Sequence, residues 1–311
     1  MPQFVLMFPG QGSQKPGMGK DLAEAFPVAK AALDAADEAL GVSLSKLMFD
    51  GPAEELTLTH NAQPALLAHG AAVWSVVWET VAPHVVAAGG HSLGEFTAYH
   101  TAGSFSLADG VKLVRRRGEL MYETGVKRPG TMAAILGETS KSAEALCEEA
   151  TEAAGTVVPA NFNCPGQLVI SGEVAGVEKA MELFKAAGAK RAIKLNVSGA
   201  FHSPLMEPAK QGLRAAIDAI PFRHPEWPVF SNVDGGWDQG TPQDNLVQQL
   251  VSPVRWTEEI TAMAQWHPDA IFLEMGPGSV LAGLVKKIAP SVKTMTCGTA
   301  TEVNQLLELT Q

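Results

Sequence analysis

The segment Val85–Glu95 constrains the fold of this chain more than any other. An apolar run ends in two glycines, and Ser92 then stands between Gly90 and Gly94. This is the Gly-x-Ser-x-Gly pattern in the setting of a strand, a tight turn and a helix, which exposes a serine hydroxyl above the first turn of the helix. Glycine is needed on both sides because a side chain there would collide with its neighbours in so sharp a turn. The segment predicts a serine nucleophile in an α/β fold; the alternative is a glycine-rich turn with an inert serine.

Composition and net charge limit the classes of function that this chain can have. The chain has 311 residues, of which 46% are hydrophobic and 18% charged, as expected for an ordinary globular protein of one large domain or two modest ones. Its net charge of −10 provides no basic field, so nucleic acid is excluded as the main partner. The three cysteines (Cys147, Cys164 and Cys297) are scattered. Their spacing fits neither a disulfide framework nor a zinc site, so we expect no metal.

The N-terminus and the apolar segments predict a cytoplasmic protein that makes no membrane contact. The first residues, Met1–Val5, lack the basic start and the cleavage site of a signal peptide. The most apolar long window, Ala71–Gly90, is interrupted by Glu79, Pro83 and His84, and we expect it to be too polar to span a bilayer.

Strands and helices alternate along the first ninety residues. The apolar run Phe4–Phe8 predicts a buried strand. It leads into the glycine-rich loop Gly10–Gln14, which is either a plain turn or part of a site. Lys20–Leu40 predicts a helix broken at Pro27, and Asn61–Val81 predicts another. With the strand that starts at Val85, this order indicates an α/β fold.

The last third of the chain continues this pattern. We expect strands over Val229–Val233 and Ala270–Glu274, and helices over Trp256–Trp266 and Ser279–Ile288.

The segment Ser106–Tyr122 predicts an amphipathic helix that turns one arginine inward. Ser106 and Asp109 have the spacing of a capping box. At about 100° per residue, Arg117 falls at the edge of the apolar face, whereas Arg115 and Arg116 are expected on a solvated face. A buried guanidinium needs an anionic partner. Arg117 is therefore a candidate for binding an anionic ligand; a structural ion pair or a side chain reaching to solvent is the alternative.

Residues 128–197 show a different order of predicted strands and helices from the rest of the chain. Strands are predicted near residues 131–136, 156–162, 167–171 and 191–195, with helices near 140–154 and 174–187. The order β-α-β-β-α-β is that of a ferredoxin-like unit. We therefore expect a small ferredoxin-like domain over 128–197, inserted into a large domain formed by 1–127 and 198–311.

His202 is the candidate partner of the serine. It lies in the loop Ser198–Met206, bounded by glycine, serine and proline, before a predicted helix. A loop histidine can meet a distant serine and act as its general base; the alternative is a surface histidine without a role. A serine–histidine pair suits acyl transfer, and backbone N–H groups at the start of the Leu93 helix can bind the oxyanion. The interval between Ser92 and His202 holds no obvious loop aspartate, unlike that of an α/β-hydrolase.

Several motifs in order resemble the family of malonyl-CoA:acyl carrier protein transacylases of type II fatty acid synthesis. The resemblance covers essentially the whole chain and implies an α/β-hydrolase-like core with a parallel sheet plus the inserted ferredoxin-like domain. The segments that carry it are Phe8–Gln14, Gly90–Glu95, Arg117-Gly118, Asn161–Asn163, Phe201–Ser203, Gln249-Leu250 and Glu274–Gly278.

The resemblance implies roles for individual residues. Ser92 matches the nucleophile that carries the malonyl ester, and His202 matches its general base. Arg117 matches the residue that pairs with the malonyl carboxylate, for which the guanidinium fork is suited. The backbone N–H groups of Gln11 and Leu93 match the oxyanion hole.

Four further positions follow from the same resemblance. The backbone carbonyl of Gln249 matches the group that orients the histidine, which would explain the absent acid. Asn161 and Asn163 line the corresponding cleft. Phe201 resembles the bulky residue of malonyl-selective acyltransferases, so we expect malonyl to be preferred over methylmalonyl.

The implied reaction is ping-pong transfer between two thioesters. Malonyl-CoA acylates the serine, coenzyme A leaves, and the phosphopantetheine thiol of holo-acyl carrier protein accepts the malonyl group. No metal or redox cofactor is implied, and a monomer suffices. Because acyl carrier proteins are acidic, docking would depend on local basic clusters, of which the candidates are Lys127/Arg128, Lys190/Arg191/Lys194 and Lys286/Lys287.

Three other functions stay open on the sequence alone. An acyltransferase serving a polyketide synthase would use the same chemistry with another carrier. A serine esterase or thioesterase is disfavoured by Arg117 and by the missing acid. A nucleotide- or CoA-binding module would use the glycine-rich loops and leave Ser92 inert.

Overall fold

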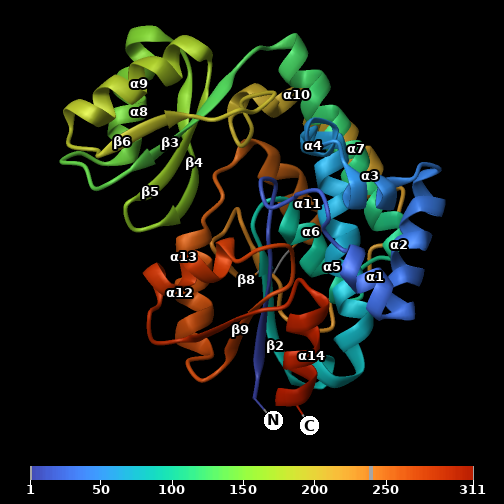
Figure 1. The fold of residues 1–311 in the computed structure, drawn as a ribbon. Coiled ribbons are helices and arrows are strands. Elements are labelled where there is room, and N and C mark those ends of the chain that lie inside the picture. The colour runs from blue at the N-terminus through green and yellow to red at the C-terminus, as the bar shows by residue number, and fades with distance from the viewer. Residues whose placement is uncertain (1, 238–240, 311) are drawn as a thin grey trace.

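A parallel β-sheet forms the centre of the larger part of the molecule. The computed structural model describes residues 2–237 and 241–310 (Figure 1). Four strands pair in the order β10-β9-β1-β2, all parallel. Val229 adds a parallel bridge to Ala88 on the outer side of β2. The strands are β1 (Phe4–Phe8), β2 (Val85–Gly90), β9 (Ile271–Glu274) and β10 (Lys293–Thr296).

Strand β1 shows why this sheet is buried on both faces. All five of its residues are buried. Because successive side chains of a strand point to opposite faces, Phe4, Leu6 and Phe8 enter one hydrophobic cluster, whereas Val5 and Met7 enter another. A strand covered on both faces is continuously apolar, which is the pattern that the sequence shows.

Helices cover both faces of the sheet. Figure 1 shows α1, α2, α5, α6 and α7 on one side and α12 and α13 on the other. The helices of the larger part are α1 (Lys20–Ala25), α2 (Pro27–Leu40), α3 (Leu44–Asp50), α4 (Ala53–Thr57), α5 (Thr59–Val81), α6 (Leu93–Thr101), α7 (Leu107–Lys127), α10 (Glu207–Asp218), α11 (Pro242–Gln248), α12 (Trp256–Trp266), α13 (Val280–Ile288) and α14 (Ala300–Leu309). Short 3-10 helices are η1 (Ala82–His84), η2 (Pro204–Met206) and η3 (Gln249–Val251), and a two-stranded ribbon joins β7 (Phe230–Ser231) to β8 (Gly236–Trp237).

A second, antiparallel sheet forms the smaller part, at the upper left of Figure 1. Its strands pair in the order β4-β5-β3-β6, and α8 and α9 pack against it around a separate hydrophobic cluster. Strand β4 also reaches the larger part, because Asn161 bridges Val254. The elements are β3 (Thr131–Leu136), α8 (Ala143–Ala154), β4 (Val157–Cys164), β5 (Gln167–Gly172), α9 (Val174–Ala186) and β6 (Arg191–Lys194).

The long helix α5 is a core helix. The stretch Thr59–His84 is long and apolar enough to cross a membrane by length and composition, with a mean hydropathy of 1.3, but 67% of its apolar window is buried in the fold. The expectation of no spanning segment considered only the window Ala71–Gly90. The apolar stretch in the structure begins twelve residues before that window. It also includes Leu66, Leu67 and neighbouring alanines, which make it more apolar than the window that was considered.

The predicted α/β fold with a parallel sheet and covering helices is confirmed. The break at Pro27 is observed between α1 and α2, and Gly41 ends α2 with a left-handed φ of 67°. Sequence patterns missed β10 and α14 at the C-terminus and the short helices α3 and α4. The segments β10, α3 and α4 are short and lack a clear period. Helix α14 does carry a sequence signal that was overlooked, because Thr299 and Glu302 form a capping box in front of the buried Val303 and Leu306.

Candidate active site

Ser92 lies in a sharp turn between β2 and α6. Its backbone has φ 54° and ψ −104°, a conformation that side-chain-bearing residues rarely adopt. The flanking glycines make the turn possible. A Cβ on Gly90 would lie 1.9 Å from the carbonyl carbon of Gly94, and a Cβ on Gly94 would lie 1.9 Å from the carbonyl oxygen of Phe8. The turn therefore requires both glycines of the motif, for the steric reason that the sequence suggests.

His202 meets the serine from a different part of the chain. Its Nε2 atom lies 2.8 Å from Ser92 Oγ, and its Nδ1 atom lies 2.9 Å from the backbone oxygen of Gln249. Because that oxygen can only accept a hydrogen bond, Nδ1 carries the proton and Nε2 is left to accept from the serine hydroxyl. Burial, and next the nearby Arg117 charge, lower the pKa of His202 to about 3, so the ring is neutral at physiological pH.

Arg117 is buried beside the serine with a cationic guanidinium. It is 1% exposed, and its Nη2 donates to Ser92 Oγ at 3.1 Å. Neutral amide oxygens hold the fork: Nη1 donates to Gln63 Oε1 at 2.7 Å and Nη2 to Gln249 Oε1 at 2.8 Å. Burial lowers the pKa of Arg117 to about 10, while Glu95 acts in the opposite direction, so the side chain keeps its charge at neutral pH. Among the described residues Arg117 forms no ion pair, which leaves its charge available to an anionic ligand.

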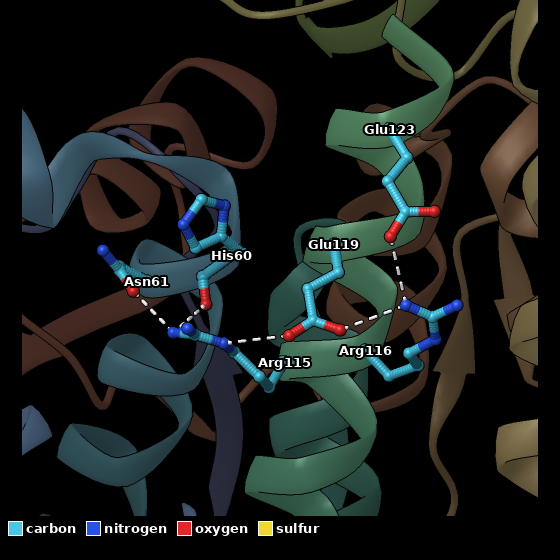
Figure 2. A network of polar contacts seen from close by, with 6 residues as sticks. All are labelled: His60, Asn61, Arg115, Arg116, Glu119 and Glu123. Atoms are coloured by element: carbon cyan, nitrogen blue, oxygen red, sulfur yellow. Dashed lines mark hydrogen bonds and ion pairs between the residues drawn. The ribbon is translucent and has the colours of Figure 1, made fainter. Parts of the chain in front are cut away.

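The neighbouring arginines confirm one expectation and correct another. Arg116 faces solvent and pairs with Glu119 at 3.1 Å, as expected (Figure 2). The expectation that Arg115 lies on a solvated face is wrong in part. Arg115 is half-buried, and its Nη1 donates to the backbone oxygen of His60 and to Asn61 Oδ1, so that it joins α7 to the start of α5 (Figure 2).

A cavity of about 390 Å³ opens over the serine between the two parts of the chain. Eight of the nine predicted site residues line it: Gln11, Ser92, Leu93, Arg117, Asn161, Asn163, Phe201 and His202. Within the described chain, the N–H groups of Gln11 and Leu93 donate to no protein acceptor, and both border the cavity. The geometry thus offers an alcohol, a neutral base, a buried cation and two open backbone donors around one space.

Gln249, the ninth predicted residue, lies behind the cavity rather than in its wall. It is fully buried, and it contacts all three central residues. Besides the carbonyl that receives His202, its side chain accepts from Arg117 and donates to the backbone oxygen of Ser92 at 3.1 Å. The role implied for its backbone matches this geometry, whereas the side-chain contacts were not expected.

Comparison with known proteins identifies the family. The acyl transferase domain family matches residues 5–303. The malonyl CoA-acyl carrier protein transacylase of Bacillus subtilis (strain 168) is 48% identical over 298 residues, which is 95% of this chain and 93% of that protein. The enzyme of the same description from Escherichia coli (strain K12) is 42% identical and covers 99% of this chain and 100% of its own. The chain belongs to the malonyl CoA-acyl carrier protein transacylase family.

Solved structures of the family superpose on nearly the whole chain. An acyl-carrier-protein S-malonyltransferase from Bartonella henselae is 41% identical with a TM-score of 0.93, covering 99% of both chains. A type II PKS acyl-carrier protein in complex with its malonyl-transacylase gives 40% identity and a TM-score of 0.93, again over 99% of both chains. The resemblance found in the sequence is confirmed over its full length.

Several residues of this transacylase site escaped the sequence analysis. Gln63 holds Arg117, and His91 bonds through Nε2 to Asn163 Oδ1 at 2.8 Å. Asn232 accepts a hydrogen bond from the Ser92 backbone. The position of Asn232 at the end of a predicted strand is a usable signal, because ligand sites of α/β sheets lie at the carboxyl ends of the strands.

Over residues 2–237 and 241–310, no group of three or more His, Cys, Asp or Glu side chains is placed to hold a metal ion.

Proposed function

We propose that this chain moves the malonyl group from malonyl-CoA to the phosphopantetheine thiol of acyl carrier protein, through an ester on Ser92. The observation that carries the proposal is the buried Arg117 guanidinium, 3.1 Å from Ser92 Oγ and held by amide oxygens rather than by a carboxylate. A cation in this position favours an acyl group that carries its own carboxylate.

The first half-reaction forms the ester. His202 Nε2 takes the hydroxyl proton of Ser92 as Oγ attacks the thioester carbonyl carbon. The N–H groups of Gln11 and Leu93, the latter at the N-terminus of α6, stabilise the oxyanion. The C–S bond then breaks, and His202 returns the proton to the departing sulfur of coenzyme A.

The second half-reaction reverses these steps with another thiol. The phosphopantetheine thiol gives its proton to His202, and its sulfur attacks the ester carbonyl. The bond to Ser92 Oγ breaks, and the hydroxyl regains its proton from the histidine. Neither half-reaction uses a metal or a redox cofactor, and one chain supplies every group.

Gln249 takes the place of the acid of a hydrolase triad. Its carbonyl oxygen accepts from His202 Nδ1 and thereby fixes the tautomer, as a carboxylate would. Unlike a carboxylate, a carbonyl adds no negative charge next to the buried arginine. This arrangement supports transfer of an anionic acyl group over plain ester hydrolysis.

Intact mass spectrometry after mixing with malonyl-CoA tests the function. We expect a stable malonyl adduct that is absent in Ser92→Ala and that is released on addition of holo-acyl carrier protein. Rapid formation of free malonate without carrier would indicate a hydrolase. No adduct at all would indicate a binding module with an inert serine. Transfer to a polyketide carrier in preference to a fatty acid carrier would assign the chain to polyketide synthesis.

Two of the three basic clusters lie within two residues, along the chain, of a residue of the cavity wall, and we propose them as the carrier docking site. Helix α13 supplies Leu281 and Leu284 to the cavity wall and carries the exposed Lys286 and Lys287. The cluster Lys190/Arg191/Lys194 precedes Leu195, which also lines the cavity. Charge reversal at either cluster should weaken transfer to acyl carrier protein and leave acylation by malonyl-CoA intact, whereas reversal at Lys127/Arg128 serves as the control. Unchanged transfer in both variants would refute electrostatic docking.

We also propose the fold type of each domain, a monomeric state and a cytoplasmic location. The strand order β4-β5-β3-β6 with two helices supports a ferredoxin-like domain over 128–197, and the serine turn above a parallel sheet supports an α/β-hydrolase-like core over 1–127 and 198–311. A cytoplasmic monomer fits an enzyme whose two substrates are a coenzyme A thioester and a small carrier protein. Sedimentation of the purified chain and cell fractionation test these two points.

A further inference from the structure

A second polar cluster lies behind the Ser92 turn, on the side away from the cavity. Asn232 follows β7 and packs between two carboxyl side chains, Glu95 of α6 and Glu259 of α12. All three residues are 0% exposed, and none of them lines the cavity. The proposed reaction does not use them.

The side-chain amide of Asn232 spans the turn. Its Oδ1 accepts from the backbone N–H of Ser92 at 2.7 Å, and its Nδ2 donates to the backbone oxygen of Gly90 at 2.7 Å. The second hydrogen of Nδ2 points to Glu259 Oε1 at 2.8 Å. A backbone N–H can only donate and a backbone oxygen can only accept, so these contacts fix the orientation of the amide. Both hydrogens on Nδ2 and the oxygen Oδ1 of Asn232 therefore take part in hydrogen bonds.

These contacts act on a strained backbone. The φ of 54° at Ser92 is a conformation that persists only where the surroundings determine it. Other contacts hold the edges of the turn: His91 N donates to Phe8 O at 3.0 Å, and Gln249 Nε2 donates to Ser92 O at 3.1 Å. Asn232 is the one side chain, among those of residues 2–237 and 241–310, that hydrogen-bonds to the turn on both sides of His91, through Gly90 and Ser92.

Glu259 is suited to hold Asn232 as a neutral acceptor. Burial, and next the charge of Glu95, raise the pKa of Glu259 well above the ordinary value, which favours the neutral form of its carboxyl group. Its Oε2 is buried and has no partner among the described residues. A neutral carboxyl group can receive the Asn232 hydrogen without placing a second negative charge beside Glu95.

We propose that Asn232, held by Glu259, is a positioning residue that keeps the Ser92 turn in its reactive conformation. By accepting from Ser92 N–H, Asn232 also removes that group from the oxyanion and leaves the N–H groups of Gln11 and Leu93 for this purpose. The proposal rests on the acyl transfer proposed above, since it concerns the same nucleophile.

Single-turnover acylation by malonyl-CoA, followed by intact mass, tests this role in the full chain. The variants are Asn232→Asp, Glu259→Gln and the double variant, with Ile260→Ala as the control. Ile260 is buried in the hydrophobic core beside Glu259, so its truncation destabilises the same helix without removing a polar contact. Thermal unfolding of each variant measures the loss of stability.

Asn232→Asp replaces Nδ2 by an oxygen that faces the two acceptors Gly90 O and Glu259 Oε1. We expect the acylation rate at saturating malonyl-CoA to fall about 100-fold, with the half-saturating concentration changed by less than about twofold, because the turn shifts while Arg117 stays in place. Glu259→Gln keeps an acceptor, and we expect a change of less than about threefold. In the double variant the new amide at position 259 can donate to the new carboxylate at position 232. We therefore expect the double variant to acylate about tenfold faster than Asn232→Asp.

A faster acylation rate in the double variant than in Asn232→Asp would show that the hydrogen bonds of Asn232 position the turn, and that the loss of rate does not come from lower stability of the fold. The proposal is overturned if Asn232→Asp acylates within about threefold of wild type, or if Ile260→Ala loses as much rate at an equal loss of stability. Should Asn232→Asp not fold, Asn232→Ala gives the same comparison with the control, with an expected loss of at least about tenfold. Absence of acylation in the wild type would refute the proposed function instead.

Discussion

The Nε2 atom of His202 lies 2.8 Å from Ser92 Oγ, and these two residues are the only non-glycine residues with positive φ in the part of the chain that the structure describes. Both occupy a backbone conformation that disfavours side chains, with φ of 54° for Ser92 and 56° for His202. Local strain that coincides at two contacting positions, 110 residues apart, is typical of a site built for chemistry.

The His202 ring should make acylation insensitive to pH over a wide range. Its lowered pKa, about 3, keeps the ring in the basic form down to mildly acidic pH. We therefore expect a flat rate of acylation between about pH 5 and 8, with the acidic fall lying near or below pH 4. His202→Gln should lower the rate about 10²- to 10⁴-fold at every pH. A fall centred near pH 6.5 in stopped-flow measurements would contradict the assignment.

Arg117→Ala should remove the preference for a carboxylate-bearing donor. Loss of the guanidinium deletes charged hydrogen bonds to the acyl group, and we expect kcat/KM for malonyl-CoA to fall about 100-fold or more. Acetyl-CoA has no carboxylate, so its own kcat/KM serves as the internal control and should change much less. Equal losses for both donors would show that Arg117 acts on the shape of the site rather than on the charge of the substrate.

Phe201→Ser should admit a branched donor. The ring is 5% exposed and forms part of the cavity wall, and the resemblance to malonyl-selective acyltransferases implies that it excludes an α-methyl group. Discrimination by one methyl group in an apolar pocket amounts to about 10- to 200-fold, and we expect Phe201→Ser to reduce it. Competition between malonyl-CoA and methylmalonyl-CoA, with products separated by mass, measures the ratio. Comparable turnover of the two donors by the wild type would refute the assignment.

Gly94→Ala should disrupt the serine turn. The added Cβ would lie 1.9 Å from the backbone oxygen of Phe8, so the first turn of α6 must move away from β1. We expect a loss of more than about 2 kcal/mol in the free energy of unfolding, together with loss of acylation. Gly283→Ala in α13 is the matched control. A Cβ added at Gly283 would meet no atom within 4 Å, and we expect a gain of about 0.5–1 kcal/mol.

The core histidine His69 should make stability fall in acid. It is fully buried in α5, and burial lowers its pKa to about 4. Between the unfolded pKa of about 6.5 and the folded value the unfolded chain binds more protons, so stability decreases as pH falls through this window. His69→Leu should reduce the dependence of the unfolding free energy on pH between about 6.5 and 4 by the contribution of one histidine. An unaltered slope in His69→Leu would contradict the prediction.

Local sequence patterns predicted much of this structure because they reflect interactions between residues that are close together in the chain. The apolar run Phe4–Phe8 predicts a strand buried on both faces, and the glycines around Ser92 predict the turn, because both effects act within a few residues. The helical period likewise predicts that Arg117 faces inward and Arg116 outward. Each of these features is read from neighbours along the chain.

The contacts that complete the site depend on long-range packing. Asn232 lies 140 residues from Ser92, and Gln249 lies 132 residues from Arg117. An asparagine or a glutamine has no period and no local motif that reveals its partner. These groups come together only because β2, β7, α7 and η3 meet in the fold. The sequence by itself determined the serine turn, the inward-facing arginine and the parallel sheet beneath them. The tertiary structure alone decided which buried amides and carboxyl groups hold them, because hydrogen-bond partners are chosen by folding and not by proximity along the chain.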